Sequence, residues 1–123
     1  KGLVLPDCFS MKTALYFSVG NIHFCTSHLQ SSNMSDCEDI SCKQITDILS
    51  TSYHKNMILI GDLNHNSAYK YIPTEKNNYD PTWNDEILDY ILPIGNMLVK
   101  DVNVLHINIQ DVSDHYPIEG IVM

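Results

Sequence analysis

Six polar residues stand at the ends of apolar segments, where packing gives no reason for them: His28, Asp62, Asn64, Asp89, Asp114 and His115. Each has an ordinary explanation when taken alone, because a histidine after a strand usually lies at the surface and Asp or Asn commonly forms a turn. Asp89 is the hardest to explain in this way, since a carboxylate within the apolar run 87–92 loses hydration unless it has a partner.

Together these residues could catalyse the attack of water on a phosphate ester. Asp62, Asn64 and Asp114 offer the oxygen atoms that a hard cation such as Mg²⁺ prefers. The two histidines of the set are candidate general bases near neutral pH. A histidine base works best when a carboxylate holds its other ring nitrogen, and Asp89 is the candidate for that carboxylate. These parts suit metal-assisted hydrolysis.

The first half of the chain predicts elements that would place these residues at strand ends. Segments 14–19 and 22–26 alternate in polarity around a two-residue Gly-Asn turn, which predicts a β-hairpin. A capping box begins at Ser35, and the apolar periodicity after it predicts a helix over 36–52. Run 57–60 is apolar throughout, as is typical of a central strand buried on both faces.

The second half predicts further strands between loops. The expected elements are a short helix at 67–71, a loop over 73–85, a strand over 87–92, one or two strands within 97–109 and a closing strand over 117–123. Polar residues at strand ends lie where ligand sites form in open α/β sheets.

Composition limits the possible partners. Seven basic and fifteen acidic residues give a net charge of −8, there is no Arg, and the lysines are scattered, which disfavours a general grip on nucleic acid. No apolar run approaches the roughly 20 residues that span a bilayer.

The four cysteines contain no Cys-x-x-Cys pair that would indicate zinc. They are either free thiols or partly disulfide-bonded, and the second alternative favours a secreted, extracellular protein.

Four short motifs occur in one order along the chain: Ser27-His28-Leu29, Gly61-Asp62-Leu63-Asn64, Leu88-Asp89-Tyr90-Ile91-Leu92 and Ser113-Asp114-His115-Tyr116-Pro117. This ordered set resembles the C-terminal motifs of the endonuclease/exonuclease/phosphatase (deoxyribonuclease I-like) superfamily. The resemblance implies an α/β (α+β) fold of two packed sheets flanked by helices. Residues 1–123 would then form the C-terminal part of a single domain, which is half of a four-layer β-sandwich with a mixed sheet.

The resemblance also implies a role for each matching residue. His115 would be the general base, Asp89 would fix its ring, and His28 would stabilise the charge that develops on the phosphate. Asp62 and Asn64 would face the metal and the phosphate and orient the attacking water. The cofactor would be Mg²⁺ or another divalent cation.

Asp114 would help to hold the metal in such a site. The family's main metal ligand is a glutamate in its N-terminal half, for which this chain has no room. We therefore expect the chain alone to bind metal poorly, to be nearly inactive, and to expose the sheet face meant for the missing half.

Within this superfamily, the motifs are most similar to those of neutral sphingomyelinase-type phospholipases C. The substrate of these enzymes is a phospholipid headgroup at a membrane surface. Pro81-Thr82-Trp83-Asn84 contributes to this similarity, and Trp83 could lie at a membrane interface or serve as a packing anchor under a loop. A nuclease or DNA-end phosphodiesterase and an inositol-phosphate phosphatase are the alternatives within the superfamily. A non-catalytic remnant that lacks the metal-binding glutamate is the alternative outside enzymes.

Overall fold

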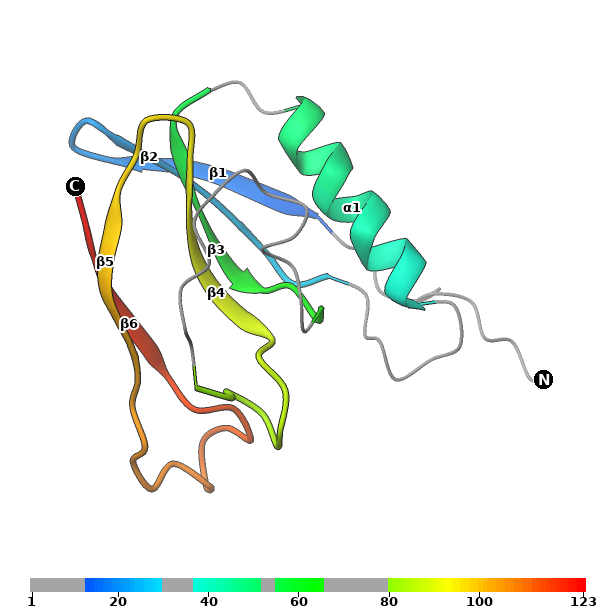
Figure 1. Cartoon of the computed structure of the whole chain (residues 1–123), viewed down its shortest axis with the longest axis vertical. Coiled ribbons are helices and arrows are strands. Elements are labelled where there is room, and N and C mark those ends of the chain that lie inside the picture. The colour runs from blue at the N-terminus through cyan, green and yellow to red at the C-terminus, as the bar shows by residue number, and fades with distance from the viewer. Residues whose placement is uncertain (1–12, 30–36, 52–54, 66–79) are drawn as a thin grey trace.

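The computed structural model describes residues 13–29, 37–51, 55–65 and 80–123. In chain order its elements are β1 (Ala14–Val19), β2 (Ile22–Ser27), α1 (Cys37–Thr51), β3 (Met57–Asp62), β4 (Asp89–Ile94), β5 (Val99–Val104) and β6 (Ile118–Val122), as shown in Figure 1. The predicted hairpin, helix and central strand are confirmed within these residues. The expected helix at 67–71 and the start of the capping box at Ser35 lie outside them.

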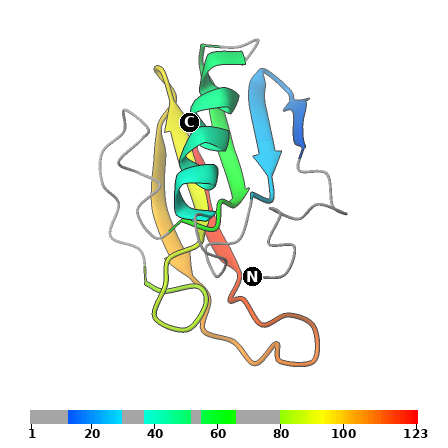
Figure 2. The ribbon, with the colours of Figure 1, turned by 90° about the vertical axis from the view of Figure 1, so that its right-hand side faces the viewer.

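The first four strands form one mixed sheet in the order β1-β2-β3-β4. Strands β2 and β3 are parallel, because α1 carries the chain back across the sheet between them, while the β1–β2 and β3–β4 pairs are antiparallel. Strands β5 and β6 form a separate antiparallel pair. Helix α1 lies on one side of the mixed sheet and the β5–β6 pair on the other, beside β4 (Figures 1 and 2).

The helix-covered face of the sheet holds the core of the described residues. Its buried members are Cys25, Leu29, Ile45, Ile48, Met57, Leu59, Leu63, Tyr90, Leu92 and Ile94. Cys25 is a free thiol whose burial raises its pKa. Every second residue of β3 and β4 belongs to this set, so the residues between them must face the β5–β6 side. Asp62 and Asp89 are among those residues.

The described residues leave one part of the second face uncovered. Ala14 and Tyr16 of β1 pack against the core, so the alternating residues Leu15, Phe17 and Val19 point to the opposite side. Leu15 is 62% exposed and Val19 63% exposed. A mixed sheet covered by one helix, with a second sheet over only part of its other face, is the predicted half of a β-sandwich.

The expected elements differ from the observed ones by one or two residues at several ends, and β4 differs at both, since it runs from Asp89 to Ile94 instead of over 87–92. Strand β4 begins at Asp89 rather than at 87, because the backbone N–H groups of Leu88 and Asp89 donate to the Thr82 hydroxyl before the ladder starts. In the range 97–109, where one or two strands were expected, the structure has one, β5, and beyond it the Ile107 N–H donates to the Leu105 carbonyl. No helix among the described residues is long and apolar enough to cross a membrane.

Candidate active site

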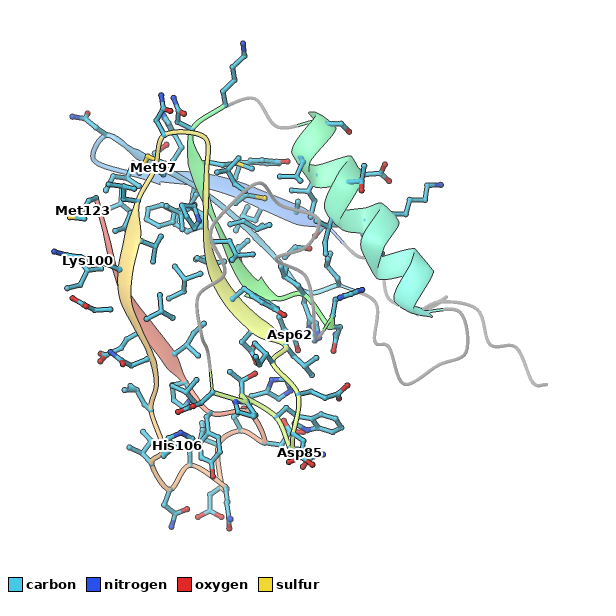
Figure 3. The ribbon with its side chains drawn as sticks, in the orientation of Figure 1. Asp62, Asp85, Met97, Lys100, His106 and Met123 are labelled. Atoms are coloured by element: carbon cyan, nitrogen blue, oxygen red, sulfur yellow. The ribbon has the colours of Figure 1, made fainter. Side chains whose placement is uncertain are left out.

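The centre of the site is a pair of carboxylates at the ends of two neighbouring strands. Asp62 is the last residue of β3, and the antiparallel register places it opposite Asp89, the first residue of β4. Opposed residues of an antiparallel pair lie within about 5.5 Å of each other and face the same side. Both side chains are largely buried, with 15% of Asp62 and 21% of Asp89 exposed. Figure 3 shows Asp62 near the middle of the molecule, between Met97 on one side and Asp85 and His106 on the other.

Gly61 allows β3 to approach β2 at this point. Its φ of +137° lies in a region that side chains rarely adopt, and a Cβ atom there would collide with the carbonyl oxygen of Ser27. Because β2 and β3 are parallel, this close approach brings the residue after β2 next to the residue that ends β3. The result is that His28 Nε2 lies 3.4 Å from Asp62 Oδ2.

One ring nitrogen of His115 is hydrogen-bonded to a carboxylate, and the other faces the rest of the site. Its Nδ1 lies 2.7 Å from Asp89 Oδ2, so the ring N–H donates to that carboxylate. Its Nε2 faces Asp62 Oδ2 at 3.8 Å and Asp114 Oδ1 at 4.0 Å. The Ser113 hydroxyl accepts the His115 backbone N–H at 3.1 Å. The carboxylate thus fixes both the tautomer and the direction of the ring.

Asn64 lies beneath the carboxylates rather than among them. It is 7% exposed and adopts a φ of +48°, which Asn tolerates better than most residues. Its backbone N–H donates to Asp62 Oδ1 at 2.9 Å, and its side-chain amide donates to the Leu29 carbonyl at 2.8 Å. Asn64 therefore braces Asp62 against the segment that carries His28, and its amide oxygen is the atom that a cation could use.

Asp114 lies at the rim of the site. Its side chain is 81% exposed, and its Oδ2 accepts a hydrogen bond from Trp83 Nε1 at 3.3 Å. The Trp83 ring lies beside His115, with centroids 6.2 Å apart. Of the six residues singled out in the sequence, four are linked by successive contacts: His28 with Asp62, Asp62 with His115, and His115 with Asp89. Asn64 is hydrogen-bonded to Asp62, and Asp114 lies at the rim beside His115.

The charges of this cluster shift the pKa values of two of its members. Burial raises the pKa of Asp62, and the neighbouring charge of Asp89 raises it further, against the opposing effects of the Asn64 N–H and the two histidines. Burial lowers the pKa of His115, but its hydrogen bond to Asp89 and the charges of Asp89, Asp62 and Asp114 outweigh burial, and the net shift is upward. Excess negative charge therefore dominates the site.

The donor set fits a divalent cation. One ligand atom each from Asp62, Asp89 and His115 lie within 4.8 Å of one another. A hard cation such as Mg²⁺ takes oxygen rather than imidazole, and Asp89 is already bonded to the His115 ring, so Asp62 is the first ligand of choice. Burial and, to a smaller extent, the charge of Asp89 raise the pKa of Asp62, and a cation at this carboxyl would oppose both effects by favouring its charged form.

Three residues that support the site appeared in motifs of the sequence but were assigned no role in positioning it. Thr82 and Tyr90 are fully buried, and Trp83 contacts both His115 and Asp114. The Tyr90 hydroxyl lies within hydrogen-bonding distance of two backbone carbonyls, those of His65 and Ile87. The Thr82-Trp83 pair was visible as part of a motif, but its signal pointed to membrane contact or loop packing and not to the placement of His115.

This arrangement of strands is similar to part of the fold of three solved structures. Beta toxin from Staphylococcus aureus, crystallised as a mutant with bound magnesium ions, matches at a TM-score of 0.63 and 18% identity, over 87% of this chain and 56% of the toxin chain. A second structure of beta toxin from the same organism matches at 0.59 and 20% identity, over 89% and 55% of the two chains.

An endonuclease/exonuclease/phosphatase family protein from Leptotrichia buccalis matches at a TM-score of 0.54 and 23% identity, over 89% of this chain and 53% of its own. The chain thus spans about half the length of the solved structures it resembles. No family model and no curated protein matches the sequence. The resemblance expected from the four motifs is confirmed at the level of the fold.

Proposed function

We propose that this chain carries the histidine-and-carboxylate part of a metal-dependent phosphodiester hydrolase of the sphingomyelinase type. The observation that carries the proposal is the position of His115, with Nδ1 held 2.7 Å from Asp89 and Nε2 directed at the Asp62 carboxylate. A base that is fixed at one nitrogen and open at the other, beside a candidate cation ligand, suits the activation of water.

In this mechanism His115 Nε2 takes the proton of the attacking water, and Asp89 stabilises the imidazolium that forms. Asp62 and Asn64 orient the water, and Asp114 stands at the rim as a further metal ligand. His28, whose side chain is 67% exposed, donates a hydrogen bond to a phosphate oxygen as negative charge develops on it. Asp62 would hold Mg²⁺, which would offset the negative charge of the phosphate.

The surroundings of His115 favour a lipid headgroup over nucleic acid. A cavity of about 620 Å³ opens beside it, and Asp114 is among the residues that line this cavity. The chain has no Arg, and Figure 3 shows Lys100 on the outer side of β5, pointing away from Asp62. Nucleic-acid phosphates call for many basic contacts, whereas a phospholipid presents one phosphate. The exposed Ile107 (53%) and Val112 (87%), in the loop beside the cavity, could meet a membrane surface.

The proposal includes a partner segment. Its sheet would cover the exposed side of β1, and its glutamate would be the main ligand of Mg²⁺. Without it, the chain is expected to bind Mg²⁺ weakly and to turn over slowly, because Asp62 is a single well-placed oxygen ligand and Asp89 is engaged by His115.

The test is a phosphodiesterase assay on this chain and on a longer protein that contains it. Sphingomyelin vesicles and single-stranded DNA are compared, with Mg²⁺ and with EDTA, and the His115→Ala variant is the control. Magnesium-dependent release of phosphocholine by the longer protein, lost in the variant, is the expected result. Cleavage of DNA would overturn the lipid substrate but not the mechanism. Inactivity on both would favour a non-catalytic remnant, and strong activity of the chain alone would contradict the need for a partner segment.

A further inference from the structure

We infer that Thr82 is a positioning residue that holds the His115–Asp89 pair together from both sides. The inference rests on the proposed function for its catalytic consequence, but its structural part stands on backbone contacts. Asp89 begins β4, whereas His115 lies in the loop that precedes β6, so the pair joins two segments that belong to different sheets. A contact of this kind keeps its 2.7 Å distance only if both backbones are fixed.

The hydroxyl of Thr82 fixes the first backbone. Its oxygen accepts the N–H of Leu88 at 3.2 Å and the N–H of Asp89 at 3.3 Å. Thr82 is fully buried, so water cannot replace these bonds without entering the core. The side chain therefore sets the position from which the Asp89 carboxylate extends toward the histidine.

The backbone of the same residue fixes the second segment. The Thr82 carbonyl accepts the N–H of Tyr116 at 2.8 Å, and Tyr116 directly follows His115. The Thr82 N–H in turn donates to the Glu86 carbonyl at 3.0 Å, which closes the turn that presents the residue. One buried residue thus binds the carboxylate-bearing backbone with its side chain and the histidine-bearing backbone with its carbonyl.

Substitution at position 82 can separate positioning from general stability. Thr82→Val keeps the volume and removes the hydroxyl, Thr82→Ser keeps the hydroxyl, and Thr82→Cys offers sulfur, which is a weak acceptor. Asn56→Ala is the control for the loss of a side-chain acceptor at a site remote from His115, and it is an exposed one. Its side-chain oxygen accepts the Asn96 N–H at 2.8 Å, beside the opposite end of the β3–β4 pair, so the variant also removes one side-chain acceptor of a backbone N–H.

The first readout is the low-field NMR signal of the His115 Nδ1 proton, measured on the 123-residue chain labelled with ¹⁵N-histidine and assigned by its loss in His115→Gln. The expected result is a sharp signal in the wild type, Thr82→Ser and Asn56→Ala, a weaker one in Thr82→Cys and none in Thr82→Val. If Thr82→Val does not fold, the comparison of Thr82→Cys with Thr82→Ser replaces it.

An unchanged signal in folded Thr82→Val would overturn the inference. If that variant does not fold, an unchanged signal in Thr82→Cys would do so. The absence of any signal in the wild type would also overturn it.

The second readout is turnover in the active enzyme. Thr82→Val is expected to lower kcat by on the order of 100-fold with little change in KM, as for a catalytic group displaced by about 1 Å. Thr82→Ser should restore most of the rate, and Asn56→Ala should leave it unchanged. Equal kcat in the Val and Ser variants would overturn the catalytic part. If the wild type has no activity, the proposed function fails while the NMR result still decides whether Thr82 holds the pair.

Discussion

Replacing Gly61 with alanine tests how the fold brings two strand ends together at the site. The glycine has a φ of +137° and leaves no room for a Cβ atom next to the Ser27 carbonyl. Alanine must therefore either strain the backbone or push β3 away from β2. Either response moves Asp62, the next residue, relative to His28.

Two effects set how much stability the Gly61→Ala variant loses. Forcing a side chain into this region of φ costs about 1–3 kcal/mol, and crowding a packed position costs about 1–3 kcal/mol more. We expect the free energy of unfolding to fall by about 4 kcal/mol. At an unfolding entropy of about 2.1 cal/mol/K per residue, this corresponds to a Tm lower by about 15 °C for a 123-residue chain.

Urea unfolding, followed by circular dichroism and by fluorescence of the single tryptophan, Trp83, measures this loss. Gly20→Ala is the control, because Gly20 also has a positive φ (+58°) but nothing lies within 4 Å of its would-be Cβ. The control should lose about 1 kcal/mol or less, since only the strain of φ applies and the unfolded chain loses entropy. Equal losses in the two variants would refute the argument that the close approach at Ser27 adds to the strain of φ at Gly61.

Three further changes have defined outcomes. Asp89→Asn in the active enzyme should leave the circular dichroism spectrum unchanged and lower kcat by about 10⁴-fold in hydrolysis assays, because His115 loses the charge that orients it; near-normal turnover would identify a different partner for His115. Asp62 has a raised pKa in the fold, so its ionisation destabilises the folded state as pH rises through that pKa. Asp62→Asn should therefore be more stable than the wild type at neutral pH in urea titrations without metal, and this gain should vanish in acid; a gain independent of pH would contradict the cause. Tyr90→Phe removes a buried hydroxyl that serves two carbonyls and should cost about 1–3 kcal/mol in the same titration, whereas no loss would show that these bonds contribute little.

The elements of this fold could be predicted where one physical signal dominated. Apolar alternation around a Gly-Asn turn gave the hairpin, and an unbroken apolar run gave the central strand, because burial sets both patterns. The start of β4 was misplaced by two residues, since Ile87 and Leu88 carry the same apolar signal as the strand. The loop before Asp89 is instead held by the Thr82 hydroxyl, which accepts the N–H groups of Leu88 and Asp89, and a pattern of apolar residues does not report a contact of that kind.

The site was predictable to a similar degree. The chemistry of a buried carboxylate indicated that Asp89 needs a partner, and the structure supplies His115, 26 positions away. The four residues that come together were all named from the sequence, whereas the bracing position of Asn64 was not. Its side-chain amide donates to the Leu29 carbonyl. This bond depends on how two strands lie side by side, and the residues around Asn64 in the sequence do not indicate that. The catalytic and metal-binding roles stay predictions.

The uncovered side of β1 has a consequence for handling the protein. Strand β1 is the outer strand of its sheet, so one row of its backbone groups has no neighbouring strand among the described residues. Leu15, Phe17 and Val19 add an apolar surface along the same strand. An exposed apolar edge strand is a template for pairing with another chain. Purified alone, this polypeptide should therefore self-associate as its concentration rises, and a charged residue at Leu15 or Val19 should suppress that association in light scattering.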